Sequence, residues 1–158
     1  MNAKMAELKR CFERAGFEEV KTVLSSGNVV FTAPAAAETV LARKAETAMA
    51  AQLGQPFFTI VRSVNVLRQL IEADPYASFR VPSNAKRVVT FLRDRPKDTL
   101  ALPVEVERAR ILAVKGRQVF TAYVPGKRGA AFMTLIEKNF GKNVTTRTWE
   151  TVKKCVAA

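Results

Sequence analysis

Residues 21–32 read Lys-Thr-Val-Leu-Ser-Ser-Gly-Asn-Val-Val-Phe-Thr, and this stretch decides the fold of the first part of the chain. It predicts two short apolar strands, one on each side of a polar turn. Gly27 can adopt the positive φ that a tight hairpin turn requires. The stretch therefore indicates a β-hairpin with Ser26, Gly27 and Asn28 at its tip. These three residues form either a ligand-binding loop or a turn with no further role.

The hairpin lies between two predicted helices. Apolar residues recur at helical spacing over residues 3–15 and again from Val40 to Leu53, where Gly54 follows as a stop. Residues 57–61 read as a further strand. The order α-β-β-α-β lacks only a leading strand to become the β-α-β-β-α-β unit of ferredoxin-like folds.

The rest of the chain predicts a second α+β unit after a connecting segment. Ser63 is expected to cap a helix that ends before Asp74-Pro75, and residues 63–86 as a whole are interpreted as a helix and linker. Residues 87–158 then read as strands, a hairpin turn at Lys115-Gly116, a helix, a closing strand and a C-terminal helix. The apolar face of the capped helix is predicted to bury Val64, Leu67, Leu70 and Ile71.

Two motifs resemble a known bacterial family. Ser26-Gly27-Asn28-Val29-Val30-Phe31, which follows Gly16-Phe17 and a short strand, is similar to the hallmark of the domain-of-unknown-function family 1697. The stretch Thr145-Thr146-Arg147-Thr148-Trp149-Glu150-Thr151-Val152 resembles that family's Thr-Thr-Arg-Asn-Trp-Asn-Thr-Val, with two amides replaced by Thr148 and Glu150.

The resemblance covers nearly the whole chain and implies two tandem ferredoxin-like units, with no established activity. Members usually begin with an apolar strand and a Gly-rich loop, and this chain starts after both, at Met1. We therefore expect residues 1–62 to form a first unit that is incomplete at its N-terminus. The missing strand would lie in the middle of the sheet, so a segment encoded upstream or a strand from a partner molecule is expected to fill its place.

The chain is strongly basic. Its 158 residues include 26 Lys and Arg against 14 Asp and Glu, a net charge of +12. Residues 1–62 hold 8 basic and 6 acidic side chains (+2), and residues 63–158 hold 18 and 8 (+10). Such a charge predicts attraction to polyanions such as RNA.

Several function classes are disfavoured by composition. The chain has no histidine, which removes Ser-His-Asp and Cys-His triads and every histidine-containing zinc site. Cys11 and Cys155 have no motif around them and are interpreted as thiols in a reducing cytosol. No apolar run is long enough to span a bilayer and no signal peptide precedes Met5, so we expect a cytoplasmic protein without a membrane, metal or cofactor role.

Two groups of residues are candidates for binding an anion. Lys127 and Arg128 lie on a Gly-flanked loop that runs into a predicted helix, where backbone N–H groups, the helix dipole and two cations converge. Lys142 and Arg147 are further cationic candidates. The alternative is that the Lys127–Arg128 loop is a solvated surface loop with no ligand.

Thr146 and Trp149 are candidates for ligand contact beside Arg147, because an indole ring can stack on an unpaired base. The alternative is that Trp149 anchors the last helix to the core.

Two functions follow as hypotheses. The leading one is a non-catalytic cytoplasmic protein that binds a polyanion such as RNA through its basic second half. The alternative is an enzyme or sensor for a small phosphorylated ligand held by Lys127, Arg128, Arg147 and the residue 26–28 turn. A charged surface without any ligand is the third interpretation.

Overall fold

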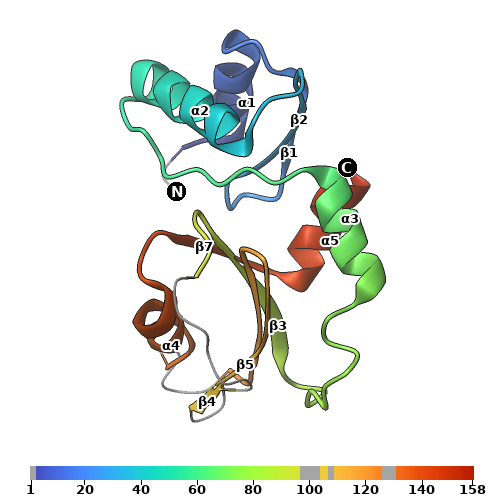
Figure 1. Ribbon diagram of the computed structural model, residues 1–158. Coiled ribbons are helices and arrows are strands. Elements are labelled where there is room, and N and C mark those ends of the chain that lie inside the picture. Colours follow the sequence, from blue (N-terminus) through green and yellow to red (C-terminus); the bar gives the residue numbers. More distant parts are fainter. Residues whose placement is uncertain (1–2, 97–103, 107–108, 126–130) are drawn as a thin grey trace. The chain divides into compact units, whose positions relative to one another are not determined.

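The computed structural model describes residues 3–96, 104–106, 109–125 and 131–158 (Figure 1). These residues form a mixed α/β protein with five helices and seven strands in two sheets. The chain divides into two compact units, the first made of Met1–Arg68 with Glu150–Ala158 and the second of Gln69–Trp149. The expected division set residues 63–86 apart as a helix and linker and assigned residues 150–158 to the second unit.

The first unit contains the predicted hairpin. Its elements are α1 (Met5–Arg14), β1 (Glu18–Val23), β2 (Asn28–Thr32) and α2 (Glu38–Leu53). The two strands pair antiparallel with Val23 opposite Asn28. Gly27 has φ +88°, which confirms the positive φ expected from the turn.

The core of the first unit forms between the hairpin and its two helices. The rings of Phe12, Phe17 and Phe31 lie 4.5–6.0 Å apart between centroids. Ala42, Ala45 and Met49 form the buried stripe of α2. Val40 was expected on this stripe and is instead 57% exposed, because it lies about 200° around the helix from Ala42.

Residues 57–61 do not form a strand, contrary to prediction. A strand needs hydrogen bonds to a neighbour, and the sheet of the first unit, as far as the structure describes it, holds β1 and β2. Phe57 is nevertheless half-buried against the core of the unit. Its apolar pattern therefore reflects packing rather than strand pairing.

The helix after this segment is α3 (Val64–Ala73). The predicted cap is confirmed, because the Val66 N–H donates to Ser63 Oγ at 3.1 Å. None of its residues is fully buried, so the four residues expected inside are only half-buried. The helix ends at Asp74, whose φ is +41°, before Pro75.

The second unit is built on a five-stranded antiparallel sheet. Its strands are β3 (Lys86–Leu92), β4 (Val104–Val106), β5 (Ala109–Lys115), β6 (Gln118–Tyr123) and β7 (Val144–Thr148), in the order β4-β5-β6-β3-β7. The predicted turn at Gly116 is confirmed, since Lys115 pairs with Gln118.

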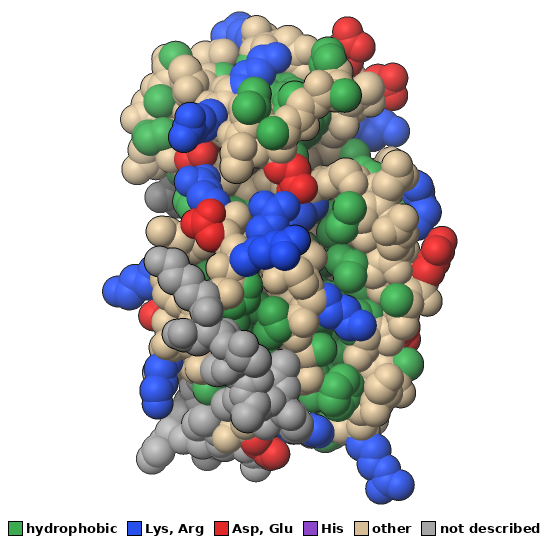
Figure 2. Space-filling view, in the orientation of Figure 1, with side chains coloured by type: hydrophobic (Ala, Val, Ile, Leu, Met, Phe, Trp, Pro, Cys, Tyr) green, Lys and Arg blue, Asp and Glu red, His purple; other side chains and the backbone are tan. Residues whose placement is uncertain are grey.

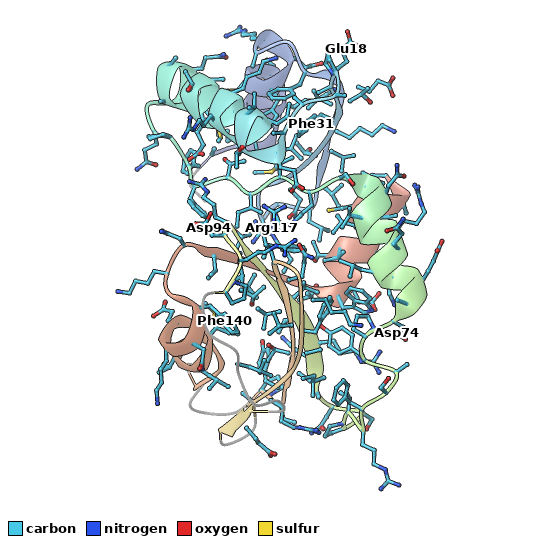
Figure 3. All side chains as sticks on the ribbon, viewed as in Figure 1. Glu18, Phe31, Asp74, Asp94, Arg117 and Phe140 are labelled. Atoms are coloured by element: carbon cyan, nitrogen blue, oxygen red, sulfur yellow. The ribbon has the colours of Figure 1, made fainter. Side chains whose placement is uncertain are left out.

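One face of this sheet is covered by α4 (Ala131–Phe140), as Figure 1 shows. Leu135 and Ile136 pack against Val88, Ile111 and Val119. Figure 3 shows Phe140 on the same helix, which packs against this cluster as well. We call this side of the sheet the α4 face.

The opposite face carries the loop of residues 74–85, which begins at Asp74 (Figure 3). This segment was expected to be a linker, but Tyr76 is 2% exposed. Its hydroxyl donates to the Val88 carbonyl at 2.6 Å. Its ring packs edge-on against Phe120 and Trp149, at 5.8 and 5.3 Å between centroids. The start of the loop is therefore anchored in the second unit's core through Tyr76.

Candidate anion-binding site

The cationic residues predicted from the sequence are found in different places. Lys127 and Arg128 lie outside the described residues. Lys142 is exposed on the short turn between α4 and β7. This turn follows Gly141, whose φ is +82° and whose N–H donates to the Glu137 carbonyl at 2.9 Å.

Arg147 lies in β7 opposite Val89 of β3. Val88 belongs to the α4 face, so Val89 and Arg147 point to the other face of the sheet. The Arg147 guanidinium is half-buried and donates to the Thr146 carbonyl at 2.9 Å.

Thr146 points away from Arg147, into the α4 face, where its Oγ1 lies 2.9 Å from Thr90 Oγ1. The hydroxyl therefore links β7 to β3 beneath α4. Because adjacent residues of a strand face opposite sides, Thr146 and Arg147 do not present their side chains to one ligand.

Trp149 is buried rather than available for stacking. It is 2% exposed, and its ring packs edge-on against Phe120 at 6.0 Å and against Tyr76. The prediction of a stacking surface is therefore wrong for the described structure, and the alternative, an aromatic anchor at the start of α5 (Trp149–Ala157), holds.

The hairpin tip shows the bonding of a braced turn. Asn28 Nδ2 donates to the Val23 carbonyl at 3.0 Å and to Ser26 Oγ at 2.8 Å. Ser26, Gly27 and Asn28 belong to the first unit, and Arg147 belongs to the second. The contacts favour the turn role for this tripeptide, because its amide is engaged in holding the turn closed.

The structure reveals further cations on the face that carries Arg147. Arg87 of β3 and Arg110 of β5 both lie opposite Ala122 of β6, so the three form one cross-strand row. Residues opposite each other share a face of the sheet. We call the side with Arg87, Arg110 and Arg147 the arginine face. The sequence signal was an arginine inside an otherwise apolar strand, as in Ala109-Arg110-Ile111-Leu112.

The arginine face has an unusual electrostatic environment at Tyr76. The Arg87 guanidinium carbon lies 5.8 Å from the centre of the Tyr76 ring, a cation–π distance. Burial raises the pKa of the Tyr76 phenol above its ordinary value, and the Arg87 charge opposes this only in part. Tyr76 therefore acts as a neutral hydrogen-bond donor.

The described residues hold no group of three or more His, Cys, Asp or Glu side chains placed to bind a metal ion. None of the helices in the described ranges is both long and apolar enough to cross a membrane.

Comparisons with known proteins identify a family and a fold. Residues 1–120 match the family model "Protein of unknown function (DUF1697)". No curated protein matches the chain. Among solved structures, a conserved bacterial protein from Streptococcus pneumoniae is similar, with a TM-score of 0.68 and 21% sequence identity. The match covers 99% of this chain and 88% of that one, and at this identity it shows the fold alone.

Proposed function

This chain belongs to the DUF1697 family, for which no function is established, and we propose that it is a non-catalytic, cytoplasmic binding protein for a polyanion such as RNA. The contact surface is the basic second unit. The binding is electrostatic and directed at phosphates rather than at bases.

The distribution of charge carries this proposal. Residues 69–149, the second unit, hold 15 Lys and Arg and 7 Asp and Glu, a net charge of +8 out of +12. The remaining residues hold 11 and 7, a net charge of +4. Figure 2 shows Lys and Arg side chains at many separate places on the visible face. A field of this sign attracts polyanions and makes their binding depend on salt.

The buried aromatic residues support the restriction to phosphates. RNA-binding sheets that read bases use exposed aromatic rings. On the arginine face, Phe120 and Trp149 are 0% and 2% exposed. They offer no stacking surface, whereas Arg87 is exposed in the same sheet.

The proposal includes two ferredoxin-like units. In the second, the order β5-β6-β3-β7 corresponds to the second, third, first and fourth strands of such a unit, with β4 added at the edge. In the first, we propose that the outer edge of β2 accepts a further strand. Outward-pointing amides of an open edge exchange rapidly with deuterium, so slow exchange in β2 of the isolated chain would contradict an open edge.

The function is tested by RNA binding at several salt concentrations. Fluorescence anisotropy with a labelled single-stranded RNA should show affinity that falls with salt, with a slope of about 0.7 per phosphate contact. Replacing Lys127 and Arg128 with Ala should lower the slope by about 1.4. The matched control is the replacement of Lys153 and Lys154, which removes the same charge from the first unit and should leave the slope unchanged.

The outcomes separate the hypotheses. Absence of RNA binding by the folded wild-type protein at low salt would refute the proposed function. A thermal shift with one nucleotide or sugar phosphate, without salt-dependent RNA binding, would instead support the alternative of a protein for a small phosphorylated ligand.

A further inference from the structure

Arg87 and Arg110 on the arginine face and Arg80 on the residue 74–85 loop belong to one region of the second unit. Arg87 and Arg110 flank Ala122 in one cross-strand row. Arg110 Nη1 donates to the carbonyl of Arg80, which lies on the loop, at 3.1 Å. The loop is held there by buried Tyr76. We call Arg80, Arg87 and Arg110 the arginine cluster. Arg87 and Arg110 belong to the cross-strand row, and Arg80 belongs to the anchored loop.

One donor of this cluster has no acceptor among the residues that the structure describes. The Arg110 Nε–H is shielded from solvent and makes no hydrogen bond to any described residue. Because buried donors are almost always paired, such a group indicates an acceptor other than the described residues. A guanidinium offers five N–H donors in a planar fork that fits the oxygens of a phosphate. Arg110 uses one of its donors on Arg80.

The neighbouring groups leave the cluster positive. Arg80 and Arg87 are exposed, and the Arg87 guanidinium lies at cation–π distance from the Tyr76 ring. Glu105 of β4 lies opposite Arg110 and is the carboxylate with which an anion must compete. Asp74 accepts a hydrogen bond from the Tyr76 N–H at 3.2 Å.

We propose that Arg80, Arg87 and Arg110 form a binding site for a phosphate group, belonging either to a free phosphate compound or to the backbone of RNA. The inference deepens the proposed function, on which its RNA arm rests. Arg110 must turn about its side-chain bonds to present Nε–H and Nη–H together. The Nε–H favours this turn, because it makes no hydrogen bond to any described residue in its present orientation.

The site is tested first with inorganic phosphate. In a proton–nitrogen NMR titration of the full chain, the Arg110 Nε–H signal and the backbone amides of Arg80 and Ala122 should shift and saturate. Sodium chloride at equal ionic strength should not reproduce the shift. Lack of a saturable response, or an equal response to chloride, would show that an ordered water alone completes the site and would overturn the proposal.

Variants assign the contact to these residues. Arg110→Lys keeps the positive charge but removes the planar set of guanidinium N–H donors, and Arg87→Gln removes a second cation. Each should weaken phosphate binding at least about tenfold. Arg95→Gln, at an exposed arginine beyond the far end of β3, should have little effect. Glu105→Gln should strengthen binding, because it removes the competing carboxylate. Unchanged affinity in folded Arg110→Lys and Arg87→Gln would refute the site.

The RNA arm identifies the source of the phosphate. If Arg110→Lys weakens both RNA and phosphate binding, the site holds the RNA backbone. If it weakens phosphate binding alone, the site serves a small phosphate compound. If the wild-type protein binds phosphate saturably but does not bind RNA, the proposed function is refuted and the phosphate site is still supported.

Discussion

Replacing Tyr76 with Phe tests whether the residue 74–85 loop is held by the buried hydroxyl. The change removes the 2.6 Å hydrogen bond to the Val88 carbonyl and preserves the ring contacts with Phe120 and Trp149. A buried hydrogen bond contributes about 0.5–1.5 kcal/mol net, and an unsatisfied carbonyl adds to the loss. We expect the free energy of unfolding to fall by about 1–2 kcal/mol. For a unit of this size, each kcal/mol lowers Tm by about 4–8 °C. Fluorescence of the single Trp149 reports the transition.

The same variant has a pH signature. The folded-state pKa of Tyr76 is raised by burial, so its contribution to stability is complete below the ordinary tyrosine pKa of about 10. That contribution is lost as the pH rises from there through the folded-state pKa, by about 1.4 kcal/mol for each pH unit in which only the unfolded phenol is ionised. Tyr76→Phe should remove this alkaline loss, and Tyr123→Phe should retain it. Equal alkaline curves for wild type and Tyr76→Phe would refute the reasoning.

Three further substitutions test the first unit and α3. Phe17→Ala, at a ring that is 3% exposed, should lower the free energy of unfolding by about 3–5 kcal/mol in urea titrations followed by circular dichroism; a loss below about 1 kcal/mol would contradict the aromatic core. Ser63→Ala removes the α3 cap and should cost about 1 kcal/mol in the same assay, against no change for exposed Ser83→Ala. Gly54→Ala places a side chain at φ +78° and should cost about 1–2 kcal/mol although nothing lies within 4 Å, whereas Gly54→Asn should cost less, and equal losses would argue against backbone strain.

The parts of the fold that depend on local sequence were predictable. The hairpin at Gly27, the two-residue turn at Gly116 and the Ser63 cap are each fixed by neighbouring residues, and the structure confirms them. The strand over residues 57–61 failed for a physical reason. An apolar run shows that side chains are buried but does not show whether a neighbouring strand is present, and pairing is a property of the sheet.

The candidate site was only partly accessible from sequence. Arg147 was identified from its motif, but its partners on the arginine face, Arg87 of β3 and Arg110 of β5, lie 60 and 37 residues earlier in the chain. Only the register places Arg87 and Arg110 beside Ala122. Trp149 was ambiguous because an indole can either stack on a ligand or fill a core, and burial decided the matter. Tyr76 was missed because its partners are distant in sequence.

The position of β3 between β6 and β7 has a consequence for synthesis of the protein. Its residues 88–92 pair with residues 144–148 of β7, so this side of the sheet closes only after residues 144–148 have been made. Until then the backbone N–H and C=O groups on the β7 side of residues 88–92 have no strand to pair with. Unpaired edges of this kind can pair with other chains. A chain whose synthesis pauses or ends before Val144 exposes this edge and is prone to aggregate. The rate of translation through α4 therefore affects the yield of folded protein.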